Sequence, residues 1–185
     1  VNLVHGDLKA SNVLISSEGI AKLSDFDHSI LSSCTLGFTE TSNAGGGTLR
    51  WMAPELLLPQ EEDIAPVTKT KQTDVYALGM TILEATTGKV PYAEYRFDTA
   101  IVRALDRRQL PYRPKELSNS GPQEDWIWSL LKLCWEHDPL LRPLASEMYI
   151  MLEGFCSLRV TEDMLFTLQK PGLWQEWPGS TALWV

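Results

Sequence analysis

Apolar and polar positions alternate along the chain in patterns that predict a mainly α-helical domain with one small β-hairpin. Two short apolar runs, 13–15 and 20–23, flank the turn-forming residues 16–19, an arrangement typical of a hairpin. Apolar residues at helical spacing then predict a central helix over 73–87, which Gly88 and Pro91 would close.

Three further helices are predicted after the central one. The first begins after Asp98 as N-cap, the second covers 124–135, and the third begins near Pro143. Between these elements, the segment 29–50 is rich in Ser, Thr and Gly and predicts a long loop, while 59–70 reads as a surface insertion. Aromatic residues at helical spacing are more often core than ligand-stacking surface, so we expect a core position for Trp51, Trp126, Trp128 and Trp135.

Length and composition fit one soluble domain. The chain has 185 residues, of which 44% are hydrophobic, enough for a sizeable core. A net charge of -8 argues against a nucleic-acid partner. The cysteines and histidines lack the spacing of a disulfide framework or a zinc site. No membrane segment or signal peptide is visible, so a cytoplasmic protein is expected, although a chain that starts at Val1 says little about targeting.

Two segments carry the side chains that phosphoryl transfer requires, HGDLKASN at 5–12 and SDFD at 24–27. That reaction needs a carboxylate to orient the hydroxyl nucleophile, a cation on the moving phosphate, and oxygen ligands for Mg²⁺. Asp7, Lys9 and Asn12 can face one cavity from a single loop, and a hairpin that doubles back would return Asp25 beside Asn12. The pattern predicts a phosphoryl-transfer site.

These segments, together with WMAPE at 51–55, resemble the catalytic loop, the metal-binding triplet and the end of the activation segment of the protein kinases, in their tyrosine-kinase-like branch. Each motif alone is a weak signal, but their order and spacing together are specific. The resemblance implies that Asp7 is the catalytic base and Lys9 the partner of the transferred phosphate. It also implies that Asn12 and Asp25 bind Mg²⁺, with Mn²⁺ as an alternative, and that Leu14 lies beneath the adenine of ATP.

The same resemblance implies structural roles for several residues. Glu55 would form a buried ion pair with Arg142, although both could instead be ordinary surface charges. Asp74 would accept backbone N–H groups from the catalytic loop, and it could also cap the central helix. The remaining implied roles are structural for His5 and Phe26 and substrate docking for Thr48.

The resemblance covers the second half of a kinase domain. We expect a C-terminal lobe over 1–157, with a catalytic loop at 5–12, an activation segment at 25–55 and a helical subdomain at 73–157, followed by an extension over 158–185. The Gly-rich loop, the strand Lys and the helix Glu that precede the catalytic loop in kinases do not occur in this sequence. The chain is therefore expected to be a fragment without the N-lobe and inactive by itself.

The leading hypothesis is a protein kinase that transfers the γ-phosphate of ATP to protein hydroxyls, with Ser or Thr favoured as acceptor because of Lys9 and Thr48. The alternative is a pseudokinase or scaffold that acts through protein binding. Two departures from the family pattern support that alternative: Gly6 stands where kinases usually carry Arg, and Asp27 replaces the Gly of the metal triplet. The partners implied are ATP and a protein substrate.

Overall fold

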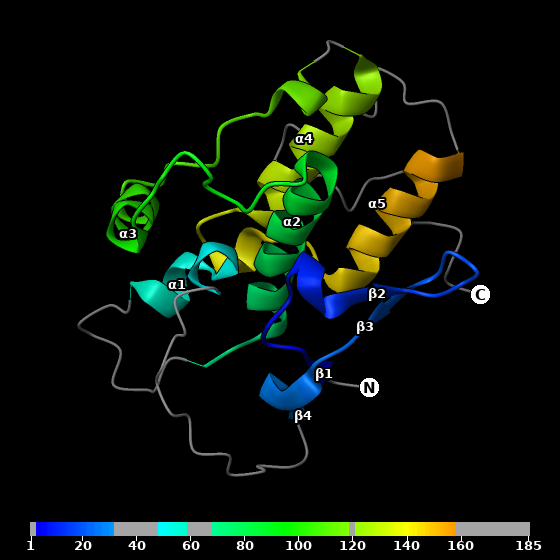
Figure 1. The fold of residues 1–185 in the computed structure, drawn as a ribbon, viewed down its shortest axis with the longest axis horizontal. Coiled ribbons are helices and arrows are strands. Elements are labelled where there is room, and N and C mark those ends of the chain that lie inside the picture. The colour runs from blue at the N-terminus through cyan, green and yellow to red at the C-terminus, as the bar shows by residue number, and fades with distance from the viewer. Residues whose placement is uncertain (1–2, 32–47, 59–67, 119–120, 158–185) are drawn as a thin grey trace.

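The computed structural model describes residues 3–31, 48–58, 68–118 and 121–157, which form a mainly helical unit with short strands along one side (Figure 1). The helices are α1 (Pro54–Leu57), α2 (Lys71–Thr87), α3 (Asp98–Asp106), α4 (Pro122–Cys134) and α5 (Ala145–Ser157). The strands are β1 (Leu3–Val4), β2 (Val13–Ile15), β3 (Ala21–Leu23) and β4 (Ile30–Leu31). No helix among these residues is long and apolar enough to cross a membrane.

The predicted hairpin is confirmed as the antiparallel pair β2–β3, in which Val13 is opposite Leu23. A second antiparallel pair, β1–β4, was not predicted and places Leu3 opposite Leu31. This second pair ties the segment before the loop 5–12 to the segment after residues 24–27. Both polar loops are therefore held next to one another by strands on either side.

Helix α2 runs through the centre of the molecule, as the apolar spacing predicted, but it begins two residues earlier than expected. Its N-cap is Thr70, which forms a capping box with Thr73: each side-chain hydroxyl accepts the backbone N–H of the other residue. Asp74 is therefore not the cap and lies in the first turn. Gly88 ends the helix in the left-handed conformation, as predicted.

The other helix boundaries differ slightly from the prediction. Asp98 was expected to be an N-cap but is the first residue of α3, and the cap position belongs to Phe97, which makes no side-chain capping bond. Helix α4 begins at Pro122, a favoured residue for a first helical turn, rather than at 124. Helix α5 begins at Ala145, two residues after Pro143.

The hydrophobic core lies between α2, α4 and the elements around them. Trp51, Trp126 and Trp135 are buried, and Trp128 packs edge-on against Trp135 with ring centroids 5.5 Å apart, so the prediction of core tryptophans is confirmed. The predicted loop 29–50 contains β4 and a 3-10 turn at Leu49–Trp51, while 32–47 lies outside the described residues. Most of the predicted insertion, 59–67, and the predicted extension, 158–185, also lie outside them.

Candidate active site

The loop between β1 and β2 gathers three polar side chains around one carboxylate. Asp7 is only 6% exposed, and its Oδ2 accepts hydrogen bonds from Lys9 Nζ at 2.6 Å and from Asn12 Nδ2 at 3.1 Å. Asn12 Nδ2 also donates to the backbone carbonyl of Asp7 at 2.9 Å. The structure therefore brings together the three loop residues that the sequence singled out.

The electrostatics of this cluster keep Asp7 ionised. Burial by itself raises the pKa of Asp7, but the hydrogen bond and positive charge of Lys9 and the hydrogen bond from Asn12 outweigh it and lower the pKa below its usual value. An ionised carboxylate accepts hydrogen bonds and cannot donate them. Asp7 is thus suited to orient a hydroxyl group.

The hairpin returns the chain to Asn12, as expected. The backbone N–H and the hydroxyl of Ser24 both donate to the Asn12 carbonyl, at 2.9 and 3.1 Å. Asp25 follows directly, with its backbone in the left-handed region at φ 63° and its side chain exposed. Leu14, on β2, is 57% exposed.

The chemistry of Asn12 and Asp25 fits a magnesium ion. Asn12 uses its amide nitrogen on Asp7, and its amide oxygen accepts one long hydrogen bond, from the Ser11 hydroxyl at 3.5 Å, which leaves a lone pair for a cation. Asp25 adds carboxylate oxygens. Such hard oxygen donors are what Mg²⁺ prefers, and Mg²⁺ typically takes few ligands from the protein itself. Among the described residues there is no cluster of three or more His, Cys, Asp or Glu that could hold a metal. Asp27, in the 3-10 turn Phe26–His28, is exposed.

A carboxylate on α2 fixes the start of the loop. The Asp74 oxygens accept the backbone N–H groups of His5 and Gly6 at 2.6 and 2.9 Å. Burial raises the pKa of Asp74, and these two hydrogen bonds only partly offset the rise. The ring of His5 connects this loop to the next one, because its Nε2 is 3.1 Å from the Ser24 carbonyl and its centroid is 4.9 Å from that of Phe26.

Position 6 requires glycine in this backbone. Gly6 has φ +79°, and a Cβ atom there would lie 2.7 Å from the carbonyl oxygen of His28. Residues with a side chain are disfavoured in this conformation, and the contact would force the backbone to shift. The glycine that replaces the expected arginine therefore matches the local geometry.

Glu55 and Arg142 form a two-pronged ion pair. Arg142 Nη1 and Nη2 donate to the two carboxylate oxygens of Glu55 at 2.6 and 2.7 Å. The Arg142 side chain is 0% exposed and that of Glu55 29%. Arg142 also donates to the backbone carbonyls of Glu136 and Gln72. This ion pair, called the anchor below, is therefore buried at its arginine end and partly exposed at its glutamate end.

Two further contacts complete the surroundings of the loop. Lys9 Nζ donates to the hydroxyl of Thr48 at 3.3 Å, so Thr48 lies beside Lys9 and Asp7. Glu84 on α2 was not predicted: its Oε2 accepts the backbone N–H of Ala10 at 2.9 Å and the indole N–H of Trp51 at 3.0 Å. The sequence signal for Glu84 was a carboxylate that follows the mainly apolar run 75–83 of α2.

Comparison with known proteins agrees with this geometry. Residues 1–152 match the family described as protein tyrosine and serine/threonine kinase. The chain is 32% identical over 150 residues to mitogen-activated protein kinase kinase kinase 3 of Arabidopsis thaliana, covering 80% of this chain and 22% of that protein.

A second relative is serine/threonine-protein kinase STY46 of Arabidopsis thaliana, which is 34% identical over 82% of this chain and 24% of the relative. A third is serine/threonine-protein kinase fray2 of Dictyostelium discoideum, which is 36% identical over 78% of this chain and 13% of the relative. The chain spans at most 24% of the length of these three relatives. Since the family match extends over most of the chain and includes every residue of the site, the chain belongs to the protein tyrosine and serine/threonine kinase family.

Proposed function

We propose that this protein transfers the γ-phosphate of ATP to serine or threonine hydroxyls of a protein substrate. The observation that carries the proposal is the buried, ionised carboxylate of Asp7, held between Lys9 and Asn12. The contact between Lys9 and Thr48 supports Ser or Thr as acceptor, as does the description of STY46 and fray2 as serine/threonine-protein kinases.

We assign each residue of the site one role in the reaction. The substrate hydroxyl donates a hydrogen bond to Asp7, which orients the oxygen toward the γ-phosphorus and receives the proton as the new O–P bond forms and the bond to the β-phosphate oxygen breaks. Lys9 would move its ammonium group onto the oxygens of the transferred phosphoryl group. Asn12 and Asp25 would hold Mg²⁺, which neutralises the phosphate charge when bound.

We further propose that residues 3–157 supply one face of the nucleotide cleft as a C-terminal lobe. Leu14, the proposed floor beneath the adenine, is 57% exposed, and Asp25 is exposed as well. An adenine ring is bound tightly only where both faces are covered, because its affinity depends on burial of apolar surface. A second lobe is therefore needed to cover the nucleotide, and we expect the chain alone to be inactive.

The experiment joins this chain to the N-terminal lobe of the relative STY46 and measures phosphate transfer from ATP to Ser, Thr and Tyr peptides. We expect transfer to Ser or Thr that falls by about 10²-fold or more in Asp7→Asn, because an amide cannot accept the proton. The matched control is Asp106→Asn, which makes the same change at an exposed position of α3. An inactive fusion that folds and binds ATP, or equal rates for Asp7→Asn and the parent, would reject catalysis and favour the non-catalytic binding module.

A further inference from the structure

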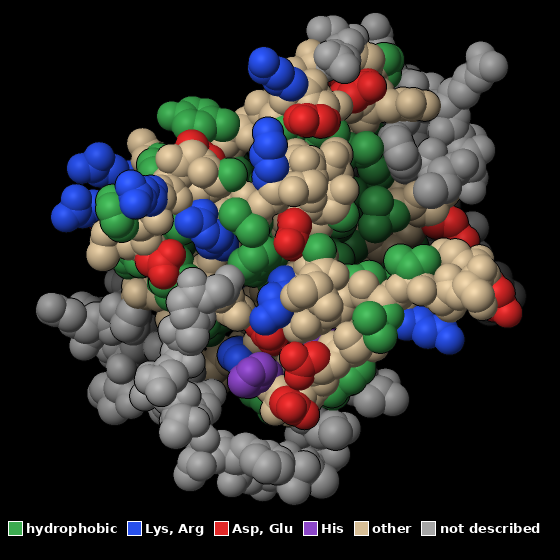
Figure 2. Space-filling view, in the orientation of Figure 1, with side chains coloured by type: hydrophobic (Ala, Val, Ile, Leu, Met, Phe, Trp, Pro, Cys, Tyr) green, Lys and Arg blue, Asp and Glu red, His purple; other side chains and the backbone are tan. Residues whose placement is uncertain are grey.

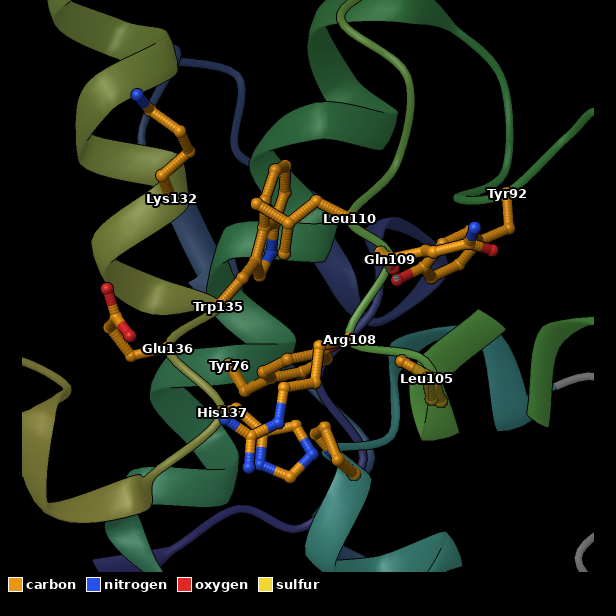
Figure 3. A pocket seen from close by; sticks show the side chains of 11 residues that line it. Tyr76, Tyr92, Leu105, Arg108, Gln109, Leu110, Lys132, Trp135, Glu136 and His137 are labelled. Carbon is orange, nitrogen blue, oxygen red and sulfur yellow. Dashed lines mark hydrogen bonds between the residues drawn. The ribbon is translucent and has the colours of Figure 1, made fainter. Parts of the chain in front are cut away.

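A cavity lies away from the loop 5–12, between α2, the end of α4 and the turn that follows α3 (Figure 3). Its volume is about 280 Å³. Aromatic and aliphatic side chains form much of its wall, including Tyr76, Tyr92, Leu105 and Trp135. None of the residues proposed to act in phosphate transfer lines this cavity.

Two positively charged side chains lie beside the apolar wall. Arg108 and Lys132 line the cavity, and Figure 3 shows Arg108 extended beside Tyr76 and His137. Arg108 and Lys132 are exposed, and no described residue forms an ion pair with either. Glu136 is the one acidic residue in the lining.

The tyrosines of the wall add no negative charge, because a tyrosine hydroxyl is neutral near pH 7 and burial raises the pKa of Tyr76 and Tyr92 further. The cavity therefore has a positive rim in a chain whose net charge is -8. Figure 2 shows Lys and Arg side chains gathered over the region of α3, where Arg103, Arg107 and Arg108 are exposed.

The backbone around the cavity is held in an unfavourable conformation. Among the described residues, the non-glycine residues with positive φ are Asp25, Tyr92 and Arg108, and the last two line this cavity. Arg108 follows the last turn of α3, where its N–H donates to the Leu105 carbonyl at 2.9 Å, in a position that helices usually give to glycine. Such residues concentrate at functional sites, and here the strain keeps an arginine at the rim.

We propose that this cavity binds a partner protein through a short segment in which one apolar side chain is flanked by carboxylates. The apolar side chain would lie beside Leu110, which is exposed in the lining, and over the buried tyrosines of the wall. The carboxylates would pair with Arg108 and Lys132. The volume is below that of most sites for drug-sized ligands and suits a single side chain. Arginine beside aromatic residues is also the composition that dominates binding energy at protein interfaces.

The test uses an acetylated pentapeptide with phenylalanine between two glutamates on each side, titrated into the isotope-labelled chain at low ionic strength. We expect amide shifts at the cavity and binding that weakens as salt is added. Arg108→Gly should weaken binding by about tenfold or more, the effect of losing one charge pair. It should not lower the melting temperature, because glycine is favoured at this backbone position. The control Lys22→Ala removes one exposed positive charge on β3 and should bind as the parent does.

Several results would overturn the proposal. The first is equal binding of the same peptide with glutamine in place of glutamate. A second is unchanged affinity in Arg108→Gly, and a third is a set of shifts outside the cavity. If Arg108→Gly fails to fold, Lys132→Gln, an exposed change on α4, takes its place with the same expectation. Self-association of the chain that Arg108→Gly abolishes, without peptide binding, would instead identify a second copy as the occupant.

Discussion

The anchor between Glu55 and Arg142 gives the sharpest test of how this fold is held together. Arg142→Ala removes both hydrogen bonds to Glu55 and those to the Glu136 and Gln72 carbonyls. It also removes the contact of the guanidinium with the ring of Tyr76, 5.1 Å from the centroid. Glu55→Gln changes less, because it keeps the length of the side chain and one acceptor oxygen while removing the charge and the second acceptor.

The two single variants should differ in cost. Loss of one partner of a buried pair costs about 3–5 kcal/mol, and we expect Arg142→Ala to lie in that range because the arginine is 0% exposed and leaves several acceptors unpaired. Glu55 is 29% exposed, so water can partly replace its partner. Glu55→Gln leaves the buried guanidinium without a charged partner, but the backbone carbonyls of Gln72, Glu136 and His137 still accept from Arg142, so a loss of about 1–3 kcal/mol is expected.

Denaturant unfolding of both single variants and the double variant measures these costs and their coupling. Because the side chains are in direct contact, we expect a coupling energy of about 1–3 kcal/mol. Arg142→Lys serves as a control that keeps the charge but loses the two-pronged geometry, and it should fall between the parent and Arg142→Ala. Losses below about 1 kcal/mol in both single variants, with no coupling, would refute the buried anchor.

Three further predictions concern the loops of the candidate site. Lys9→Met should raise the pKa of Asp7 above that in the parent, because only Asn12 and His28 then oppose the effect of burial, and carboxyl NMR titration of both proteins measures the difference. Because folding lowers the pKa of Asp7, its carboxylate stabilises the fold at pH values above the pKa of the unfolded chain, and this stabilisation is lost as pH falls through the pKa of the folded protein. Lys9→Met should therefore reduce this pH-dependent stabilisation. Gly6→Ala should cost at least about 1–2 kcal/mol in denaturant unfolding, because the positive φ costs that much and the contact of the new Cβ with the His28 carbonyl adds to it. With an N-lobe joined, Asp27→Gly should shift the relative rates of phosphate transfer with Mg²⁺ and Mn²⁺ if its carboxylate reaches the metal, and identical profiles would discard that role.

Local sequence patterns were sufficient to predict those elements that are determined by residues close together in the sequence. The hairpin follows from two apolar runs around a turn, and the end of α2 follows from Gly88. The start of α2 was misplaced because its signal is a pair of threonines, Thr70 and Thr73, that satisfy each other's N–H groups. The pair β1–β4 was missed because each strand has only two residues and the partners are far apart in the sequence.

The candidate site also contains contacts that are local in the sequence and contacts that are not. The grouping of Asp7, Lys9 and Asn12 could be predicted because one short loop carries all three. The role of Glu84 could not be predicted, because its hydrogen-bond donors, Ala10 and Trp51, lie 74 and 33 residues away in the sequence. A carboxylate beside an apolar run of a helix indicates a buried polar contact, but only the tertiary structure shows which N–H groups donate to it.

Asp74 and Glu84 together explain how α2 shapes the loop 5–12. Asp74 receives the N–H groups at the start of the loop and Glu84 the N–H of Ala10 near its end. Ten helical residues rise about 15 Å, and the five residue steps from His5 to Ala10 span at most about 17–18 Å when extended. The segment is therefore long enough to reach from one carboxylate to the other, and both of its ends are fixed on the same helix. Asp7 and Lys9 lie between the fixed ends, so the geometry of their ion pair depends on a helix that neither of them belongs to.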